Sequence, residues 1–171
     1  RIISITVNDV NRAPVLASVG NKSVDENAPL QFNVSATDPD GTTPVLSATG
    51  VPSGASFTNN GNGTGSFSWT PGFDAQGPYN VMIIATDAAS SVVTDTEAIT
   101  ITVNNVNRPP VLAAIGGKSV DENALLQFNV SATDPDGNTP TFSASNLPQG
   151  ASLSNNGNGT ATFSWTPSYT N

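Results

Sequence analysis

The sequence has 171 residues, of which 13 are acidic and five are basic, so the formal net charge is −8. It contains no cysteine and no histidine, which excludes a disulfide framework, a thiolate site and imidazole chemistry. The acidic balance argues against a nucleic-acid partner, whose binding needs Lys and Arg, and makes hard cations the natural partners of the carboxylates. No apolar run is long enough to span a membrane, so we expect no direct membrane insertion of this segment.

An internal repeat organises the chain. A shift of 96 residues aligns 11–75 with 107–171 without a gap, and 45 of the 65 pairs are identical. Residues 1–10 align in the same register with residues 97–106. We therefore predict the last strand of a preceding repeat at 1–10, a complete repeat at 11–106, and at 107–171 a repeat that lacks its last strands. This pattern predicts a segment of a longer tandem array. The third unit would need either a continuing chain or a strand from a neighbour to cover its core.

Short alternating or apolar runs, separated by turn residues, indicate β-structure throughout. Within the complete repeat we expect strands at 14–19, 22–25, 30–37, 45–48, 66–70, 79–86 and 96–103. About seven short strands in a domain of this size are typical of an immunoglobulin-like sandwich. The predicted fold class is all-β, with tandem immunoglobulin-like Greek-key β-sandwiches arranged as a rod.

An eighteen-residue stretch at 24–41 recurs at 120–137 with one substitution. It places Glu26 before an alternating apolar run and places Asp38 and Asp40 after it. The twelve residues from Glu26 to Asp38 span about 40 Å if the run is an extended strand. The acids before and after the strand therefore cannot form one site within a domain, and each group can only face a different neighbouring domain.

Two features allow a structural as well as a functional interpretation. The segment 38–41, Asp-Pro-Asp-Gly, has the residues that a type I turn prefers, so its acids could serve the turn alone. Trp69 and Trp165 could stack on sugar rings, but each alternates with a phenylalanine on one face of a strand, which favours a core position.

The motifs together resemble a cadherin repeat. The resemblance rests on the segments 24–29, 36–41 and 85–87, and residues 7–14 are similar to the linker between cadherin domains. The turn Val-Pro-Ser-Gly-Ala and the segment Phe-Ser-Trp-Thr-Pro look like the dystroglycan-type cadherin-like domains of bacterial and archaeal surface proteins. In that family calcium binds at the junctions between domains and stiffens the array.

Carried over by position, the resemblance implies Ca²⁺ ligands at three junctions. The implied ligands are Asp9, Asn11, Asp38, Asp40 and Asp87 before the complete repeat, Glu26, Asp74, Gln76, Asn105, Asn107, Asp134 and Asp136 after it, and Glu122 at a third junction. Arg12 and Arg108 stand where the family carries a further aspartate. A guanidinium at that position could replace one cation, so we expect fewer ions per junction than in animal cadherins.

The resemblance implies an extracellular or cell-surface stalk or filament, stiffened by calcium, whose partners are adjacent repeats of the same chain and like copies of itself in a filament or cell–cell contact. The alternative is a carbohydrate-binding accessory module of a larger secreted or surface enzyme, with surface polysaccharide as its partner. We expect no enzymatic activity, because the usual nucleophile–histidine arrangements cannot be built from these residues and the paired acids suit a metal better than glycoside hydrolysis.

Overall fold

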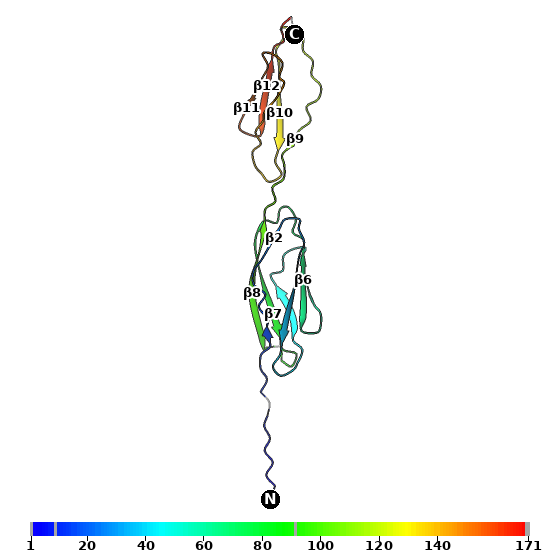
Figure 1. Ribbon diagram of the computed structural model, residues 1–171, viewed down its shortest axis with the longest axis vertical. Helices are drawn as coiled ribbons and strands as arrows, with labels where there is room; N and C mark the ends of the chain where they lie inside the picture. Colours follow the sequence, from blue (N-terminus) through cyan, green and yellow to red (C-terminus); the bar gives the residue numbers. More distant parts are fainter. Residues whose placement is uncertain (1, 9, 91, 170–171) are drawn as a thin grey trace. The chain divides into compact units, whose positions relative to one another are not determined.

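The computed structural model describes residues 2–8, 10–90 and 92–169. By its internal contacts the chain divides into two compact units, Arg1–Val106 (unit 1) and Asn107–Asn171 (unit 2). Every regular element of the described residues is a β-strand (Figure 1), which confirms the all-β prediction. In the described part of the chain no helix has the length and apolar character that crossing a membrane requires.

The first sheet of unit 1 has the strand order β1-β3-β6-β5 and is antiparallel throughout. Its strands are β1 (Val15–Leu16), β3 (Leu30–Thr37), β6 (Thr64–Trp69) and β5 (Ser56–Asn59). Phe32 of β3 pairs with Phe67 of β6, and their rings stack with centroids 4.7 Å apart. β1 is shorter than the predicted strand at 14–19, and β5 is a strand that we did not predict.

The second sheet has the order β2-β8-β7-β4. Its strands are β2 (Lys22–Asp25), β8 (Thr94–Asn104), β7 (Gly77–Thr86) and β4 (Val45–Thr49). β2 runs parallel to β8, whereas the other pairs are antiparallel. Because β2 and β4 lie at the two edges, each depends on a single neighbouring strand for its backbone hydrogen bonds.

The core of unit 1 lies between these sheets. Alternate residues of the central strands point inward, as period-two alternation predicts. The buried side chains include Val34, Phe67, Trp69, Val81, Ile83, Ile99 and Ile101, each exposed by 4% or less. Trp69 packs edge-on against Tyr79 with ring centroids 4.9 Å apart, so its predicted core position is confirmed.

The described residues of unit 2 form one sheet, of order β11-β12-β10-β9, which repeats the first sheet of unit 1. Its strands are β9 (Val111–Leu112), β10 (Leu126–Thr133), β11 (Ser152–Asn155) and β12 (Thr160–Trp165). Residues 118–121 and 141–145, which repeat β2 and β4, are not strands. The described residues of unit 2 include no counterpart of β8 or β7, so these two segments lack the neighbours that pair with them in unit 1.

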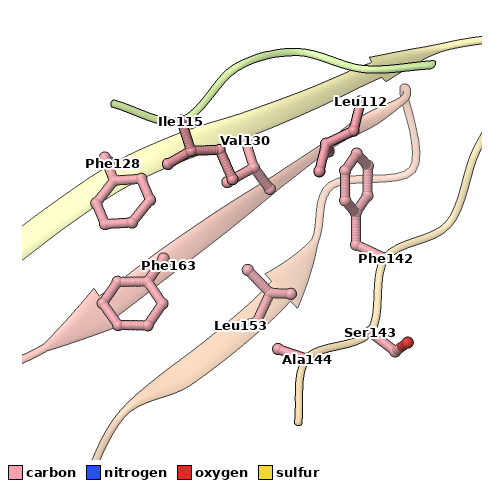
Figure 2. A pocket seen from close by; sticks show the side chains of 9 residues that line it. All are labelled: Leu112, Ile115, Phe128, Val130, Phe142, Ser143, Ala144, Leu153 and Phe163. Atoms are coloured by element: carbon pink, nitrogen blue, oxygen red, sulfur yellow. The ribbon is translucent and has the colours of Figure 1, made fainter. Parts of the chain in front are cut away.

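Within the described residues, no second sheet packs on the unit 2 sheet, and one of its faces is open. A cavity of about 200 Å³ lies on that face, and Figure 2 shows the side chains that line it. They are Leu112, Ile115, Phe128, Val130, Phe142, Ser143, Ala144, Leu153 and Phe163. In unit 1 the corresponding face is covered by the inward side chains of β7 and β8.

The N-terminal segment of unit 1, up to Val10, is rich in apolar residues and exposed. Residues 2–8 and 10 form no strand, and the side chains of Ile2, Ile3, Ile5, Val7 and Val10 are exposed by 77% or more. Their assignment to the last strand of a preceding repeat stays a prediction.

Candidate functional site

The acidic residues of the eighteen-residue stretch lie at opposite ends of β3. Before the strand, Glu26 contacts the end of β8: its backbone N–H donates to the carbonyl of Asn104 at 3.0 Å, and its Oε2 accepts from the backbone N–H of Val106 at 3.1 Å. After the strand, Asp38 and Asp40 lie in one turn, and the Asp40 carboxylate binds Arg12 of the linker segment 7–14. Each end therefore has its own group of polar residues.

The Asp-Pro-Asp-Gly segment forms a tight turn. The backbone N–H of Gly41 donates to the carbonyl of Asp38 at 3.1 Å, as in a type I turn. The backbone N–H of Asp40 donates to Oδ1 of Asp38 at 2.8 Å. Gly41 has φ of 81°, a conformation that suits glycine at the end of the turn. The turn holds both aspartates in place and directs the Asp40 carboxylate toward the linker.

Arg12 binds both oxygens of the Asp40 carboxylate. Its backbone N–H donates to Oδ2 at 2.6 Å, and its Nε donates to Oδ1 at 2.7 Å. Its Nη2 lies 2.5 Å from Oδ1 and also donates to the carbonyl of Pro39 at 2.7 Å. The backbone hydrogen bond, followed by the side-chain hydrogen bond, lowers the pKa of Asp40 from its ordinary value. We call this set of contacts the arginine anchor.

Unit 2 contains the same arginine anchor. The backbone N–H of Arg108 donates to Oδ2 of Asp136 at 2.5 Å, its Nε donates to Oδ1 at 2.7 Å, and its Nη2 donates to the carbonyl of Pro135 at 2.7 Å. The side chain of Asp136 is 4% exposed, against 7% for Asp40. The hydrogen bond from the Arg108 backbone again lowers the pKa of the carboxyl. The anchor is therefore a repeated feature of the fold.

Asp87 completes the polar group at this end of unit 1. It is 2% exposed. Its Oδ2 accepts from Nδ2 of Asn11 at 2.5 Å, and its Oδ1 accepts from the hydroxyl of Thr42 at 3.1 Å and from the backbone N–H of Ala89 at 2.9 Å. The Ala89 hydrogen bond is the first cause of a lowered pKa for Asp87, and the Asn11 hydrogen bond is the second. Both oxygens of this buried carboxylate thus have donors from the protein itself.

Among the described residues, two buried carboxylate oxygens have no hydrogen-bond partner, one at each end of β3. They are Oδ2 of Asp38 and Oε1 of Glu26. Glu26 as a whole is 3% exposed, so its free oxygen is desolvated without compensation, which is costly for a charged group. A cation at either position would satisfy the oxygen.

The predicted calcium ligands fare differently in the structure. Asn11, Asp38, Asp40 and Asp87 come together at one end of unit 1, through the hydrogen bonds described above. Asp9 lies outside the described residues. Asp74, Gln76, Asn105, Asn107 and Glu122 are exposed. Asp134 is half-buried and accepts from the backbone N–H of Asp136, whose almost fully buried carboxylate is held by Arg108.

These residues fit a calcium cluster only in part. Within the described residues no three acidic side chains are placed to hold one metal ion together. At the Asp40 end the chain's own donors already use most of the carboxylate oxygens. At the Glu26 end one buried oxygen remains available. The sequence pattern drew attention to the two arginines but not to Thr42. The repeat could not point to Thr42 as a partner of Asp87, because the same position holds Asn138 in unit 2.

Comparison with known proteins places both units in immunoglobulin-like families. The family model described as "Putative Ig domain" (He_PIG) matches residues 13–104, and a "Bacterial Ig domain" model matches residues 107–171. Chitinase A of Pseudoalteromonas piscicida is 30% identical over 134 residues, which are 78% of this chain and 16% of that protein.

Two solved structures are similar to the chain at low identity. The endo-fucoidan hydrolase MfFcnA4 of glycoside hydrolase family 107 is 16% identical with a TM-score of 0.48, over 99% of this chain and 27% of that one. The SrpA adhesin of Streptococcus sanguinis, as its R347E mutant, is 13% identical with a TM-score of 0.46, over 57% of this chain and 58% of that one. The chain thus spans a small part of chitinase A and of the endo-fucoidan hydrolase. The cadherin-like subtype stays a prediction. Because the first family model covers more than half of the sequence, the chain belongs to the "Putative Ig domain" family, and both of its units are immunoglobulin-like.

Proposed function

We propose that the chain is a non-catalytic spacer segment of an extracellular or cell-surface protein. Its immunoglobulin-like units would hold other parts of that protein at a set separation. Its partners would be adjacent repeats of the same chain, like copies of itself and surface polysaccharide. The match to part of chitinase A and the bacterial family of unit 2 support this setting.

One observation carries the proposal: the linker residues on both sides of Asn107 are tied down. The backbone of Val106 is held by Glu26 within unit 1, and Arg108 is held by Asp136 within unit 2. Only Asn107 lies between these two fixed positions. Since two residues of chain span at most about 7 Å, so short a free segment favours a stiff connection.

Single-molecule energy transfer between dyes on the two units tests the spacer. We expect a narrow distance distribution for the unaltered chain, and a broader one for Asp136→Asn, which weakens the anchor. Glu122→Gln makes the same charge change at an exposed site of unit 2 and should leave the distribution unchanged. If the distance distribution of the unaltered chain is as broad as that of a chain with a Gly-Ser insertion after Asn107, the spacer proposal is wrong.

Calcium binding is a second part of the proposal, and the free buried oxygen of Glu26 is the observation that favours it. A bound cation supplies positive charge to the carboxylate and amide oxygens around it. We expect calcium to raise the melting temperature of unit 1. The effect should be lost in Glu26→Gln and kept in Asp25→Asn, which removes an equal charge at the adjacent exposed residue. No calcium effect on the unaltered chain would reject this part alone.

A carbohydrate-binding role is the alternative, and one repeated surface feature favours it. Phe73 is 39% exposed and Tyr169, at the same position of the next repeat, is 76% exposed. Exposed aromatic rings can stack on sugars, whereas Trp69 is buried. A chitin or fucoidan pull-down should retain the chain if this alternative holds. The double substitution Phe73→Ala and Tyr169→Ala should then release it, and retention without these rings would assign any binding elsewhere.

A further inference from the structure

The two arginine anchors occupy the carboxylates that the cadherin resemblance gives to calcium. In each unit the guanidinium and the backbone N–H of one linker arginine fill both oxygens of the second aspartate of the Asp-Pro-Asp-Gly turn. This disagreement with the implied metal site appears twice, with the same donor atoms and nearly the same distances. It therefore belongs to the repeat and does not depend on the differences between the two units.

The contacts suit a guanidinium in particular. Arg12 presents Nε and Nη2 on one side of a planar group, so it binds Asp40 Oδ1 with both and still reaches the carbonyl of Pro39. A lysine ammonium is a point charge and cannot keep this fork. Charge-assisted hydrogen bonds of this kind are about twice as strong as neutral ones.

The anchor also links two parts of the chain that a junction cation would link. Arg12 belongs to the linker, whereas Asp40 follows β3, and 28 residues separate them. Asn11 makes the equivalent connection to Asp87, which follows β7. The linker is therefore fastened to two separate loops of unit 1 by side chains that the sequence itself supplies.

We propose that Arg12 and Arg108 act as built-in replacements for a junction cation, so that this end of each unit holds its linker without a divalent metal. Removing the guanidinium exposes the Asp40 carboxylate beside the free Oδ2 of Asp38. The variant end then depends on an added cation, for which calcium is the natural choice because it takes carboxylate and carbonyl oxygens. The arginines replace a cation at the Asp40 and Asp136 ends only, and this role does not depend on calcium binding at Glu26.

Hydrogen exchange of the Arg12 and Arg108 backbone amides tests the proposal on the full chain, in EDTA and in calcium. Each amide donates directly to the anchored aspartate, so its protection reports the anchor. We expect equal protection of the unaltered chain in both buffers. In Arg12→Gln the residue 12 amide should lose protection in EDTA by roughly tenfold or more, as expected when a charge-assisted hydrogen bond is lost, and calcium should restore it. Arg108→Gln should behave in the same way in unit 2.

Controls separate the anchor from charge in general. Lys22→Gln removes an equal charge elsewhere in unit 1 and should leave the residue 12 amide protected, while Arg12→Lys should protect it only partly. Three outcomes would overturn the proposal: loss of protection of the unaltered chain in EDTA, full protection of Arg12→Gln in EDTA, or a loss in Arg12→Gln that calcium does not restore. If the residue 12 and 108 amides stay protected in EDTA but the distance distribution between the units is broad, the role of the arginines is supported and the spacer proposal is rejected.

Discussion

The two units share a four-residue segment that forms a strand in unit 1 and no strand in unit 2. Residues 22–25 and 118–121 both read Lys-Ser-Val-Asp, yet the first is strand β2 and the second is not a strand. In unit 1 this segment pairs only with β8, and the described residues of unit 2 offer no counterpart of β8. A short strand at the edge of a sheet is thus determined by its neighbour more than by its own residues.

The same comparison explains why Glu26 and Glu122, which occupy the same position of the repeat before the long strand, differ in burial. Glu26 is 3% exposed because the backbone of Asn104 and Val106 closes over it. Glu122 has the same sequence neighbours and is exposed. A glutamate of one motif is therefore a buried candidate ligand in one unit and a surface acid in the other. The β7–β8 pair creates both the core and the environment of this carboxylate.

The largest effect should come from giving unit 2 the strands that unit 1 has. Appending a second copy of residues 76–106 after Asn171 continues the 96-residue register. We expect the free energy of unfolding of unit 2 to rise by about 5 kcal/mol, the lower end for a folded domain. Residues 118–121 should gain amide protection. Urea unfolding followed by Trp165 fluorescence in a Trp69→Phe background measures the gain.

A control for this extension keeps its length and removes its apolar face. Aspartate in place of the appended counterparts of Ile99 and Ile101 should abolish the stabilisation, because both side chains are almost fully buried in unit 1. If residues 118–121 stay unprotected in the chain with the apolar extension, the neighbouring strand does not determine whether this segment forms a strand.

A smaller effect should separate two equivalent phenylalanines. Phe67 is 1% exposed, whereas Phe163 at the same position of unit 2 is half-buried. Phe67→Ala should lower the free energy of unfolding of unit 1 by about 3–5 kcal/mol, the usual range for a buried phenylalanine. Phe163→Ala should cost roughly half as much, because less buried surface is lost. The fluorescence of Trp69 and Trp165 follows the unfolding of each unit. If the two substitutions lower the free energy of unfolding equally, the open face of unit 2 is covered in solution.

Much of the fold followed from sequence periodicity, and the exceptions have a common cause. The expected strands at 22–25 and 30–37 coincide with β2 and β3 in unit 1. β5 was missed because Ser56–Asn59 has one large apolar residue, Phe57, and forms as an edge strand against β6. Edge strands can carry a weak sequence pattern of their own, since packing against the neighbouring strand contributes to their stability.

The candidate site was predictable in position but not in its contacts. The spacing in the stretch 24–41 placed the acids at two separate ends, as the structure has them. It could not reveal that Arg12 takes both oxygens of Asp40, because the two residues are 28 positions apart. Nor could it reveal that the Asp87 carboxylate accepts hydrogen bonds from Thr42 and Asn11. Such contacts depend on which loops meet, and only the folded chain shows that.

A matched pair of turn substitutions should give a moderate and a small effect. Gly50 has φ of 71°, and a Cβ there would lie 2.5 Å from the carbonyl oxygen of Asn80 in β7. Gly50→Asn, which introduces the residue of unit 2, should therefore destabilise unit 1 by about 1–3 kcal/mol through overpacking. Asn146 has φ of 55°, with no described β7 counterpart beside it. Asn146→Gly should change unit 2 by no more than about 0.5 kcal/mol, and denaturant unfolding measures both.

The smallest effect should be a difference in acid sensitivity. The pKa values of Asp40, Asp87 and Glu97 in unit 1 are lowered, and so is that of Asp136 in unit 2. For Glu97 the leading cause is the hydrogen bond from the backbone N–H of Gly20, followed by that of Val19. A lowered pKa in the folded state contributes stability above the ordinary value of the group, and this contribution is lost as the pH falls through the folded value.

Unit 1 should consequently lose more stability than unit 2 on acidification, starting near the ordinary Glu value of 4.5 and continuing below the Asp value of 3.8. Melting temperatures of the two units against pH, read by Trp69 and Trp165 separately, measure the difference. Glu97→Gln removes the carboxylate that caps residues 18–20 and should flatten the dependence for unit 1 alone. Equal slopes for both units would mean that the hydrogen bonds of Asp87 and Glu97 do not favour the charged carboxylates, which would remove the electrostatic distinction between the units.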